Sequence, residues 1–520
     1  MGWANLQHYL AALEEAGELL RISRPVDVEL EAGCIADRLV KSDGKAVLFE
    51  QPRLPDGSIS EFPLAMNLFG SSERVNLALG VKDSSEIGER LVGMMKPDVK
   101  AISKNPFKGI SLALDGLRMA PKRVKKGACQ EVVIDDPDLT KLPIPKTWPK
   151  DGGPFITLPL VVTKDPTNGE HNLGMYRSQI FGPKECGLHW QMHKHAADHA
   201  AAGNLDGAKI PVAICIGGPP ELIFSAIAPL PDNLSEYMFT SFLSKKRLKL
   251  VKAKTQDIWI PAEADIVIEG YCVPQETRVE GPFGDHFGLY SLAGDYPVLH
   301  VTSVTHREGA VAPMTIVGLP PMEDGFLGNA ITDAFLPVLN FQHRDVLNMH
   351  VPLETGFHNL AIVATKQRYP RQGRKAVLGL LGAGQLMFTK ISVVADAAHP
   401  VKNMESLLDI LHSKVDPKSD LIVIPGMVAD TLEAASPWEN VHDKLLIDAA
   451  TFANADPRKG GSGLPRGTSF DPTPNWRRGL EEAPGVDVDF TAKVRALDGI
   501  VEASLLRPSI LVVTTKIDGT

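Results

Sequence analysis

The run Glu280–Tyr290 (EGPFGDHFGLY) is the stretch around which the rest of the chain is organised. Its three glycines and one proline allow the backbone to turn sharply and to approach a ligand closely. Glu280, Asp285 and His286 place two carboxylates and an imidazole on this turn. A polar, Gly-rich loop is often only a solvated surface connection. Two carboxylates on a stiff turn are also what acid–base catalysis requires, so the run predicts a catalytic loop.

The segments on either side of this turn have the pattern of β-strands. Short strand-like runs alternate with Pro- and Gly-rich turns, and one helical run interrupts them at Leu234–Ser244. Such a succession predicts a closed or partly closed β-barrel. The predicted strands are Glu131–Ile134, Ile156–Thr163, Asn172–Phe181, Ile210–Ile216, Leu248–Lys254, Asp265–Val273 and Tyr296–Thr305.

The two flanks have a different periodicity. Asn5 is suited to cap an amphipathic helix whose inner face carries Leu6, Tyr9, Leu10 and Leu13. Beyond residue 325, a helical run is followed by alternating strands and helices, which predicts an α/β domain. The predicted fold is therefore an α/β and β multidomain protein. Its parts are an N-terminal mixed α/β domain (1–125), a central barrel domain (126–325), a linking helix (326–345) and a C-terminal α/β domain (346–520) with a last helix after a Thr491 cap.

Composition excludes several classes of protein. The chain has 520 residues, of which 44% are hydrophobic and 22% charged, as in ordinary globular proteins of several domains. A net charge of -9 argues against a nucleic-acid surface. Five scattered cysteines, no signal-peptide pattern and no long apolar run predict a cytoplasmic protein. The absence of a P-loop, a nucleophile elbow and a complete Gly-x-Gly-x-x-Gly motif leaves ATP and NAD chemistry poorly supported.

Three further runs carry a resemblance to a known family. They are Asn172–Arg177 (NLGMYR), Leu188–His195 (LHWQMHKH) and Pro231–Glu236 (PDNLSE). Together with the catalytic loop they resemble the UbiD family of decarboxylases, most closely its polyprenyl-hydroxybenzoate branch, from the N-terminal helix to about Asp448. The resemblance implies a flavin-reductase-like split barrel and non-oxidative decarboxylation of an aromatic or α,β-unsaturated acid with prenylated FMN. The leading substrate is 4-hydroxy-3-polyprenylbenzoate of ubiquinone biosynthesis, and the alternative is a small phenolic or heteroaromatic acid.

The resemblance also implies roles for individual residues. Arg177, Glu280 and Asp285 match the acid–base network of the family. Asn172, His193 and Glu236 match the ligands of a manganese ion at the cofactor phosphate, and such oxygen and nitrogen donors suit manganese or magnesium. A potassium ion is a further candidate. The implied cofactor-binding residues are Asn172, Met175, Tyr176, Arg177, Ser178, Gln191, His193, Glu236 and Lys390.

Several of these residues also have plain structural explanations. The run Asn233–Glu236 matches a helix N-cap followed by Glu at the third helical position, so Glu236 could be a capping group. Lys390 begins a predicted strand, where a solvent-facing lysine is common. Most histidines between His189 and His199 would be polar packing or surface groups. Each of these explanations stays open at the level of sequence.

The spacing of Asn172 and Arg177 is informative. Residues five apart in a regular strand point to opposite faces, so Asn172 and Arg177 either serve different sides of the site or lie in an irregular strand, for which Gly174 is the candidate bulge. Arg177 needs an anion, either a structural carboxylate or Glu280 together with the substrate carboxylate. As a proton donor to the carbon that loses CO2, Asp285 would have to hold its proton in a partly apolar site.

Two other functions compete with decarboxylation. One is a metal-dependent phosphate-ester hydrolase that uses the Asn/His/Glu set. The other is a non-catalytic flavin-binding or assembly subunit, which would not need Arg177, Glu280 and Asp285. Decarboxylation itself leaves a carbanion, so an electron-accepting cofactor is expected. The resemblance then implies a flavin prenyltransferase as cofactor supplier and a homo-oligomer between dimer and hexamer, and only a polyprenylated substrate would imply peripheral membrane contact.

Overall fold

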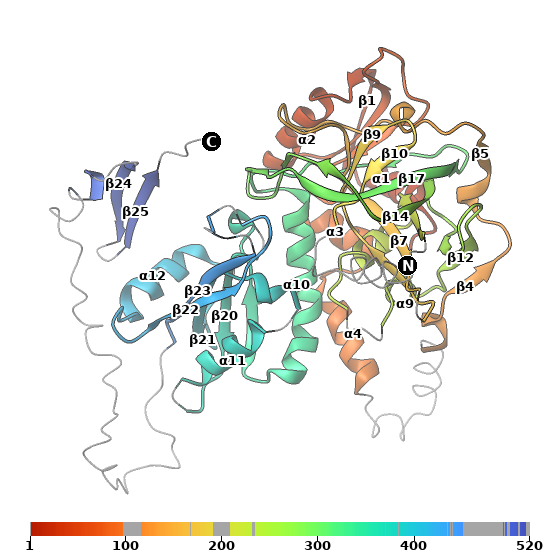
Figure 1. The fold of residues 1–520 in the computed structure, drawn as a ribbon. Helices are drawn as coiled ribbons and strands as arrows, with labels where there is room; N and C mark the ends of the chain where they lie inside the picture. The colour runs from red at the N-terminus through yellow and green to blue at the C-terminus, as the bar shows by residue number, and fades with distance from the viewer. Residues whose placement is uncertain are drawn as a thin grey trace, which may run out of the picture. The chain divides into compact units, whose positions relative to one another are not determined.

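The computed structural model of the protein describes most of the chain in two compact units, Met1–Pro337 and Val338–Thr520 (Figure 1). The boundary between the units falls within the predicted linking helix. Three predicted site or capping residues, Gln191, His193 and Thr491, lie outside the described residues, as does Asn233. The described ranges are 2–96, 116–190, 209–230 and 234–450, apart from the single residues 167, 357, 370, 383, 434, 437 and 439, together with short stretches between 492 and 515.

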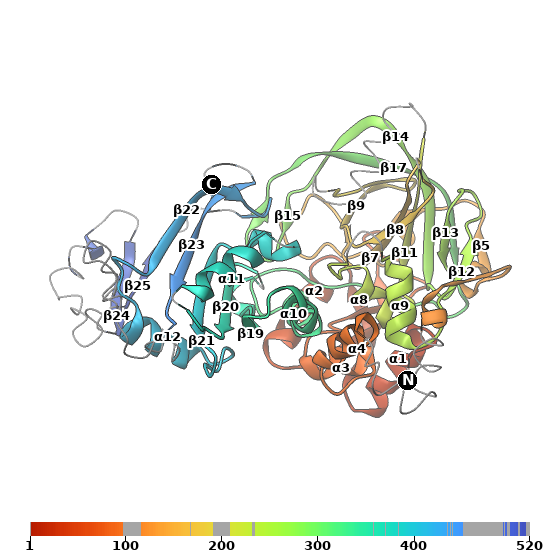
Figure 2. The same cartoon turned by 90° about the horizontal axis from the view of Figure 1, so that it is seen from below.

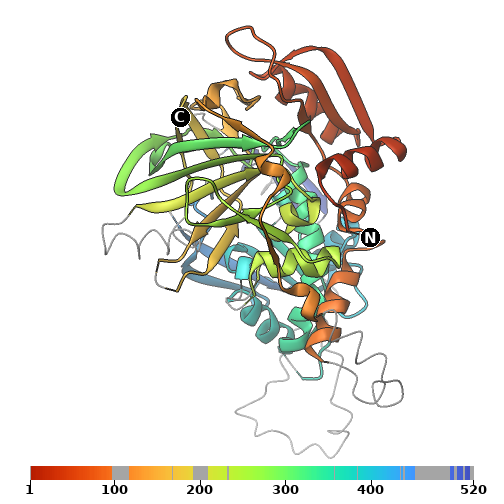
Figure 3. The same cartoon turned by 90° about the vertical axis from the view of Figure 1, so that its right-hand side faces the viewer.

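The first unit opens with the predicted amphipathic helix, α1 (Leu6–Glu15). The Asn5 side chain accepts a hydrogen bond from the His8 amide, and the four predicted apolar residues are the buried ones. A four-stranded sheet with the order β1-β2-β3-β18 follows (Figure 3). Its last strand returns from beyond the catalytic loop. The elements of this part are β1 (Leu19–Asp27), α2 (Glu31–Lys41), β2 (Ala46–Arg53), β3 (Leu64–Met66), α3 (Ser72–Leu79), α4 (Ser85–Met95) and β18 (Ala312–Pro313).

A nine-stranded sheet forms the centre of the first unit. The strand order is β6-β9-β10-β17-β14-β11-β7-β8, and β5 pairs with β17. No pairing among the described residues joins β6 to β8, so a closed barrel is not found and the split barrel is not confirmed. The strands are β5 (Val132–Ile134), β6 (Phe155–Ile156), β7 (Pro159–Lys164), β8 (His171–Gly174), β9 (Ser178–Gly182), β10 (Glu185–Gly187), β11 (Ile210–Ile216), β14 (Ile266–Glu280) and β17 (Gly294–His306).

The longest strand of this sheet leads directly into the catalytic loop. The predicted strand Asp265–Val273 continues as β14 to Glu280, which pairs with Gly294 of β17. The four-stranded and the nine-stranded sheet share one hydrophobic core that includes Phe49 and Ile268. The remaining elements of the unit are β4 (Lys122–Val124), η1 (Ala128–Gln130), η2 (Leu139–Lys141), α8 (Pro220–Ser225), α9 (Glu236–Ser244), β12 (Lys249–Lys252), β13 (Trp259–Pro261), β15 (Phe283–Gly284) and β16 (Tyr290–Ser291).

The second unit has the predicted α/β alternation, built on a five-stranded sheet of order β19-β20-β21-β23-β22 (Figure 2). Strands β20, β21 and β23 are parallel, and the two edge strands run antiparallel to them. The helix that begins at Gln372 ends at Leu380. The elements are α10 (Glu323–Gln342), which crosses the boundary, β19 (Val346–His350), η3 (Leu353–Thr355), β20 (Leu360–Thr365), α11 (Gln372–Leu380), η4 (Gly384–Phe388), β21 (Ile391–Asp396), α12 (Met404–Lys414), β22 (Leu421–Val428), β23 (Val441–Asp448), β24 (Ile500–Arg507) and β25 (Ile510–Thr515).

Within the described part of the chain, no helix combines the length and the apolar character that crossing a membrane would require.

Candidate active site

The catalytic loop is a short hairpin at the end of β14. Strands β15 and β16 pair with each other, and the amide of Asp285 donates to the carbonyl of Leu289 at 2.9 Å. Gly281 has a φ of +94°, a conformation that L side chains rarely adopt. The hairpin therefore fixes the backbone of Asp285.

The base of the hairpin is anchored to the segment before β6. The Gly284 amide donates to Asp151 Oδ1 at 2.8 Å. A Cβ atom on Gly284 would lie 2.1 Å from Trp148 Cδ1, and the Trp148 indole is itself held by a 2.7 Å hydrogen bond to the carbonyl of Val317. Only glycine fits this close approach, so the residue before Asp285 is fixed by packing.

Arg177 joins the two carboxylates of the loop. Its Nε lies 3.0 Å from Glu280 Oε1, and its Nη1 lies 2.5 Å from Asp285 Oδ2. A third donor, Nη2, reaches Ser291 Oγ at 3.0 Å, and the guanidinium lies over the ring of Phe283 at 4.6 Å. Glu280 is completely buried, Asp285 is buried, and the Arg177 side chain is only 9% exposed. The structure thus brings together the three residues that match the acid–base network.

His189 is a fourth member of this cluster. Its Nδ1 lies 2.6 Å from Glu280 Oε2, and both side chains are buried. Burial lowers the pKa of His189, which favours the neutral ring with Nδ1–H as the donor. His189 Nε2 and Trp190 Nε1 are buried without a hydrogen-bond partner among the described residues. The sequence had placed His189 among packing or surface histidines, and only the density of histidines there signalled a site.

The two carboxylates are ionised at neutral pH. Burial alone would raise the pKa of Glu280, but the hydrogen bond from His189 and the charge of Arg177 hold that pKa below its ordinary value. Burial likewise acts to raise the pKa of Asp285, and the hydrogen bond from His286 with the charge of Arg177 lowers it overall. Asp285 is therefore ionised in this arrangement, so a role as proton donor would require its pKa to rise when substrate binds.

A proton-holding carboxyl group lies nearby at the start of α10. Burial raises the pKa of Asp324 to about 7, and the charge of His286 partly offsets this rise. His286 in turn contacts Asp285, with Nδ1 and Oδ1 3.0 Å apart. Asp324 thus interacts electrostatically with the His286–Asp285 pair. No motif in the sequence pointed to it, because it lies outside the catalytic loop.

The predicted strand through Asn172 and Arg177 is interrupted. Strand β8 ends at Gly174 and β9 begins at Ser178, so Arg177 lies in the irregular segment between them. This break is what a shared site for Asn172 and Arg177 predicts, and it corrects the expectation of one strand through Phe181. Because Arg177 lies outside a regular strand, the alternation of side chains between the two faces of a sheet no longer directs it to the face opposite Asn172.

Two of the three implied metal ligands lie close together. The Leu173 amide donates to Glu236 Oε2 at 3.2 Å, so the Glu236 carboxylate lies against the strand that carries Asn172. Asn172 is buried, and its amide nitrogen is 3.4 Å from the hydroxyl of Tyr176. Both side chains offer oxygen donors of the kind that manganese and magnesium bind. The third implied ligand, His193, lies outside the described residues.

The predicted helix cap before Glu236 is wrong in register. The cap is Ser235, whose hydroxyl accepts from the Met238 amide, and Glu236 is the first helical residue rather than the third. In this position Glu236 still benefits from the positive end of the helix dipole. Its carboxylate points to the neighbouring strand, so a capping role does not account for it.

The other implied cofactor-binding residues fall in two places. Met175, Tyr176 and Ser178 lie at the break between β8 and β9, and the Ser178 hydroxyl donates to the Tyr176 carbonyl at 3.2 Å. Lys390 belongs to the second unit, directly before β21, and its Nζ is 3.4 Å from Glu433 Oε1. The ion pair with Glu433 is therefore a structural explanation for Lys390 that does not involve a cofactor.

The chain was compared with models of known protein families. Three family models match consecutive parts of the chain, described as the N-terminal (residues 10–93), Rift-related (122–320) and C-terminal (325–449) domains of 3-octaprenyl-4-hydroxybenzoate carboxy-lyase. The chain belongs to the UbiD family. The family and its solved relatives are decarboxylases, so this UbiD-family chain is an enzyme of the carboxy-lyase class.

Individual relatives cover nearly the whole UbiD-family chain. An uncharacterised protein of Archaeoglobus fulgidus is 43% identical over 450 residues, which span 86% of this chain and 92% of that protein. Vanillic acid decarboxylase of Sedimentibacter hydroxybenzoicus in its closed form has a TM-score of 0.76 at 25% identity, covering 93% of this chain and 99% of its own. The UbiD-class enzyme HmfF of Pelotomaculum thermopropionicum, solved with FMN, has a TM-score of 0.74 at 25% identity, covering 89% and 98%. An evolved dimeric form of HmfF was solved with prenylated FMN (TM-score 0.72, 25% identity, covering 87% and 96%).

Proposed function

We propose that this enzyme removes the carboxyl group of an aromatic carboxylic acid, or of an α,β-unsaturated one, in a non-oxidative and reversible reaction that uses prenylated FMN. The observation that carries the proposal is the buried guanidinium of Arg177 between two ionised carboxylates, Glu280 and Asp285. A cation in this position can bind a third carboxylate, that of the substrate, in a bidentate manner. Membership of a family of decarboxylases supports the same reaction.

The residues present fit a flavin cofactor with a divalent ion. His189 Nε2 and Trp190 Nε1 are buried polar atoms that a polar ligand would satisfy. Asn172 and Glu236, with His193, would hold manganese or magnesium at the cofactor phosphate, and potassium is a further candidate ion. Met175, Tyr176, Ser178 and Gln191 would complete the cofactor site, with Lys390 as a further contact. When bound, prenylated FMN would supply the electron sink that stabilises the carbanion left by loss of CO2.

Arg177 would orient the substrate and, in doing so, prepare Asp285 as an acid. An incoming carboxylate competes with Asp285 for the guanidinium and adds a negative charge beside it. Both effects raise the pKa of Asp285, because they remove its stabilising partner and introduce a like charge. Asp285 then takes up a proton, which the neighbouring Asp324 carboxyl holds near neutral pH. After CO2 leaves, Asp285 would deliver that proton to the carbon, so that R–COO⁻ and H⁺ become R–H and CO2.

Glu280 would have a different task in this scheme. It keeps two donors, His189 and Arg177, so it stays ionised when Asp285 becomes protonated. An ionised Glu280 holds Arg177 in place while the guanidinium exchanges Asp285 for substrate. The environments of the two carboxylates thus separate their roles, one as an anchor and one as an acid.

Two substrate classes are proposed. The description of the matching family models favours 4-hydroxy-3-polyprenylbenzoate, an intermediate on the way to ubiquinone. The similarity to vanillic acid decarboxylase supports the alternative, a small phenolic or heteroaromatic acid. A flavin prenyltransferase would supply the cofactor, the central sheet would be a split barrel, and the second unit would mediate a homo-oligomer.

Replacement of Asp285 tests the proposal. In protein loaded with prenylated FMN, Asp285→Asn should keep the flavin but lose CO2 release and deuterium uptake from D2O by about 10²-fold or more, because its amide cannot donate an acidic proton. The assay uses vanillate, 3,4-dihydroxybenzoate and a 4-hydroxy-3-polyprenylbenzoate. Asp257→Asn, at an exposed carboxylate paired with two lysines, is the control. A near-normal rate in Asp285→Asn would sink the acid role.

A further inference from the structure

Two buried side chains outside the carboxylate cluster accept backbone hydrogen bonds from the catalytic loop. The Gly281 amide donates to Gln179 Oε1 at 2.7 Å, and the Gly284 amide donates to Asp151 Oδ1 at 2.8 Å. Both accepting side chains belong to residues that are only 5% exposed. Gly281 directly follows one carboxylate-bearing residue of the loop, and Gly284 directly precedes the other. Each carboxylate of the loop therefore has a neighbouring peptide unit that is held from another segment.

The segment before β6 makes further contacts with the loop. The Gly152 amide donates to the Pro282 carbonyl at 2.8 Å, and a Cβ atom on Gly152 would lie 2.2 Å from the Gly281 carbonyl oxygen. The Lys150 amide donates to the Tyr290 hydroxyl at 3.1 Å. Hydrogen bonds on both sides of Pro282, with close packing between them, leave the loop backbone little room to shift.

Asp151 joins a turn of its own segment to the loop. Its Oδ2 accepts from the Trp148 amide at 2.8 Å and from the Thr147 hydroxyl at 3.0 Å, while Oδ1 accepts from Gly284. Burial raises the pKa of Asp151, and these hydrogen bonds oppose the rise. A serine or an asparagine has one acceptor atom and could satisfy the turn alone, without the cost of a buried charge. A carboxylate has two oxygens, so it can hold the turn and the loop at the same time.

We propose that Asp151 and Gln179 are positioning residues that set the distances from Arg177 to the two carboxylates of the loop. Those distances are 3.0 Å to Glu280 and 2.5 Å to Asp285. Gln179 lies two residues after Arg177, so its contact with the loop holds Glu280 in place relative to the guanidinium. Asp151 holds Asp285 in the same way from the segment before β6. The inference rests on the proposed decarboxylation, in which Asp285 is the acid and Glu280 the anchor.

Steady-state kinetics of two variants test the positioning role. The protein is loaded with prenylated FMN and assayed with whichever of vanillate, 3,4-dihydroxybenzoate and a 4-hydroxy-3-polyprenylbenzoate the wild type decarboxylates. Asp151→Asn leaves one acceptor oxygen for three donors and displaces Asp285, so kcat should fall about tenfold or more while KM changes less than about twofold. Gln179→Met removes the acceptor beside Glu280. Arg177 then loses its alignment, and KM should rise about fivefold.

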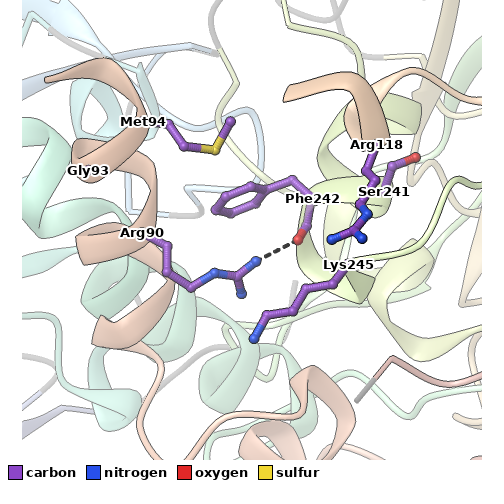
Figure 4. Close-up of a pocket in the computed structure, with 7 residues that line it drawn as sticks. All are labelled: Arg90, Gly93, Met94, Arg118, Ser241, Phe242 and Lys245. Atoms are coloured by element: carbon purple, nitrogen blue, oxygen red, sulfur yellow. Dashed lines mark hydrogen bonds between the residues drawn. The ribbon is translucent and has the colours of Figure 1, made fainter. Parts of the chain in front are cut away.

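The control is a buried hydroxyl that accepts an amide hydrogen bond elsewhere in the first unit. Ser241, near the end of α9, lines the pocket shown in Figure 4 and accepts from the Leu248 amide at 2.9 Å. Ser241→Ala should lower the urea midpoint of unfolding, as the two test variants do, but leave kcat and KM within about twofold of wild type. Kinetic changes of the same kind in all three variants would overturn the proposal.

Amide hydrogen exchange tests the same contacts without catalysis. In the wild type, the peptide that carries Gly281 and Gly284 should exchange slowly, and each test variant should raise its rate about tenfold, whereas Ser241→Ala should not. Fast exchange in the wild type, which needs no variant to fold, or unchanged exchange in both test variants would overturn the positioning role. Slow exchange without CO2 release by the wild type would contradict the proposed decarboxylation and still support the positioning of the loop.

Discussion

The imidazole of His189 lies 2.6 Å from the carboxylate of Glu280, Nδ1 to Oε2, with both side chains buried. Together with Arg177 Nε on the other oxygen, this contact gives Glu280 one donor on each side. Hydrogen bonds to the charged form of a carboxyl favour ionisation. The pair therefore explains how a fully buried carboxylate beside Asp285 remains charged.

Replacing His189 should shift the acid stability of the protein. A carboxyl group whose pKa is lower in the folded protein than in the unfolded chain stabilises the folded state at pH values above its pKa in the unfolded chain. This stabilisation is lost as the pH falls through the pKa of the group in the folded protein. His189→Leu removes the donor and raises the folded pKa of Glu280, so stability should begin to fall at a higher pH. At pH 7 we expect a loss of about 1.5–3 kcal/mol. His189→Asn keeps an N–H donor and should lose less, as urea unfolding at several pH values would measure.

The control for this prediction is His300→Leu. His300 Nε2 also lies 2.9 Å from a carboxylate, Glu276, but both side chains are partly exposed. Exposed ion pairs contribute little to stability. An equal effect of the two leucine variants, or no effect of either, would contradict the role given to His189.

Removal of Arg177 should be more damaging than removal of His189. Arg177→Gln removes the positive charge that lies 3.0 Å from Glu280 and 2.5 Å from Asp285. We expect a loss of about 3–5 kcal/mol in the free energy of unfolding at pH 7, because each buried carboxylate then lacks the guanidinium beside it. Protonation of the carboxyls should recover part of this loss as the pH is lowered. Arg278→Gln, which breaks an exposed pair with Glu185, should change stability little, and similar losses in both variants would argue against the buried network.

Gly284 should tolerate no side chain. Gly284→Ala places a methyl group against the Trp148 ring, which its own hydrogen bond holds in position. The strain should destabilise the protein by about 1–3 kcal/mol and move Asp285, so that the rate of decarboxylation falls as well. At Gly182 an added Cβ meets nothing within 4 Å, so Gly182→Ala should leave both quantities near wild type. Thermal unfolding and a rate assay would check this, and a fully active Gly284→Ala enzyme would contradict it.

Glu236 should be required for a bound divalent ion. Dialysed wild-type protein should retain about one manganese or magnesium ion per chain, and Glu236→Gln should lose it because a neutral amide binds these ions weakly. Elemental analysis of the dialysed proteins measures this directly. Glu263→Gln, at an exposed pair with Lys249, is the control. Equal metal content in all three proteins would remove Glu236 from the proposed site.

Local features of the fold could be predicted from the sequence. The Asn5 cap and the four buried residues of α1 follow from neighbouring side chains alone, and β11 matches its predicted bounds Ile210–Ile216. The break between Asn172 and Arg177 could also be anticipated, because the required side-chain directions conflict with a regular strand. The register of the cap at Ser235 could not, since Asn233 and Ser235 are both good capping residues.

Contacts between distant parts of the chain could not be predicted. His189 and Glu280 are 91 residues apart, and only the pairing of β10, β17 and β14 brings their segments together. The fit of Gly284 against Trp148 depends on a segment that carries no motif. The lowered pKa of Asp285 was not foreseen, because Arg177 and His286 outweigh the burial that the apolar surroundings suggested. The family resemblance indicated which residues form the candidate active site, whereas their protonation states follow from contacts that only the structure shows.

The most direct test of the decarboxylase assignment is the identity of the bound cofactor. The protein would be co-expressed with a flavin prenyltransferase, and the ligand released from it would be examined by absorbance and mass spectrometry. We predict FMN carrying one extra prenyl unit, together with CO2 release from an aromatic acid by the same preparation. Protein that binds no flavin under these conditions would contradict it.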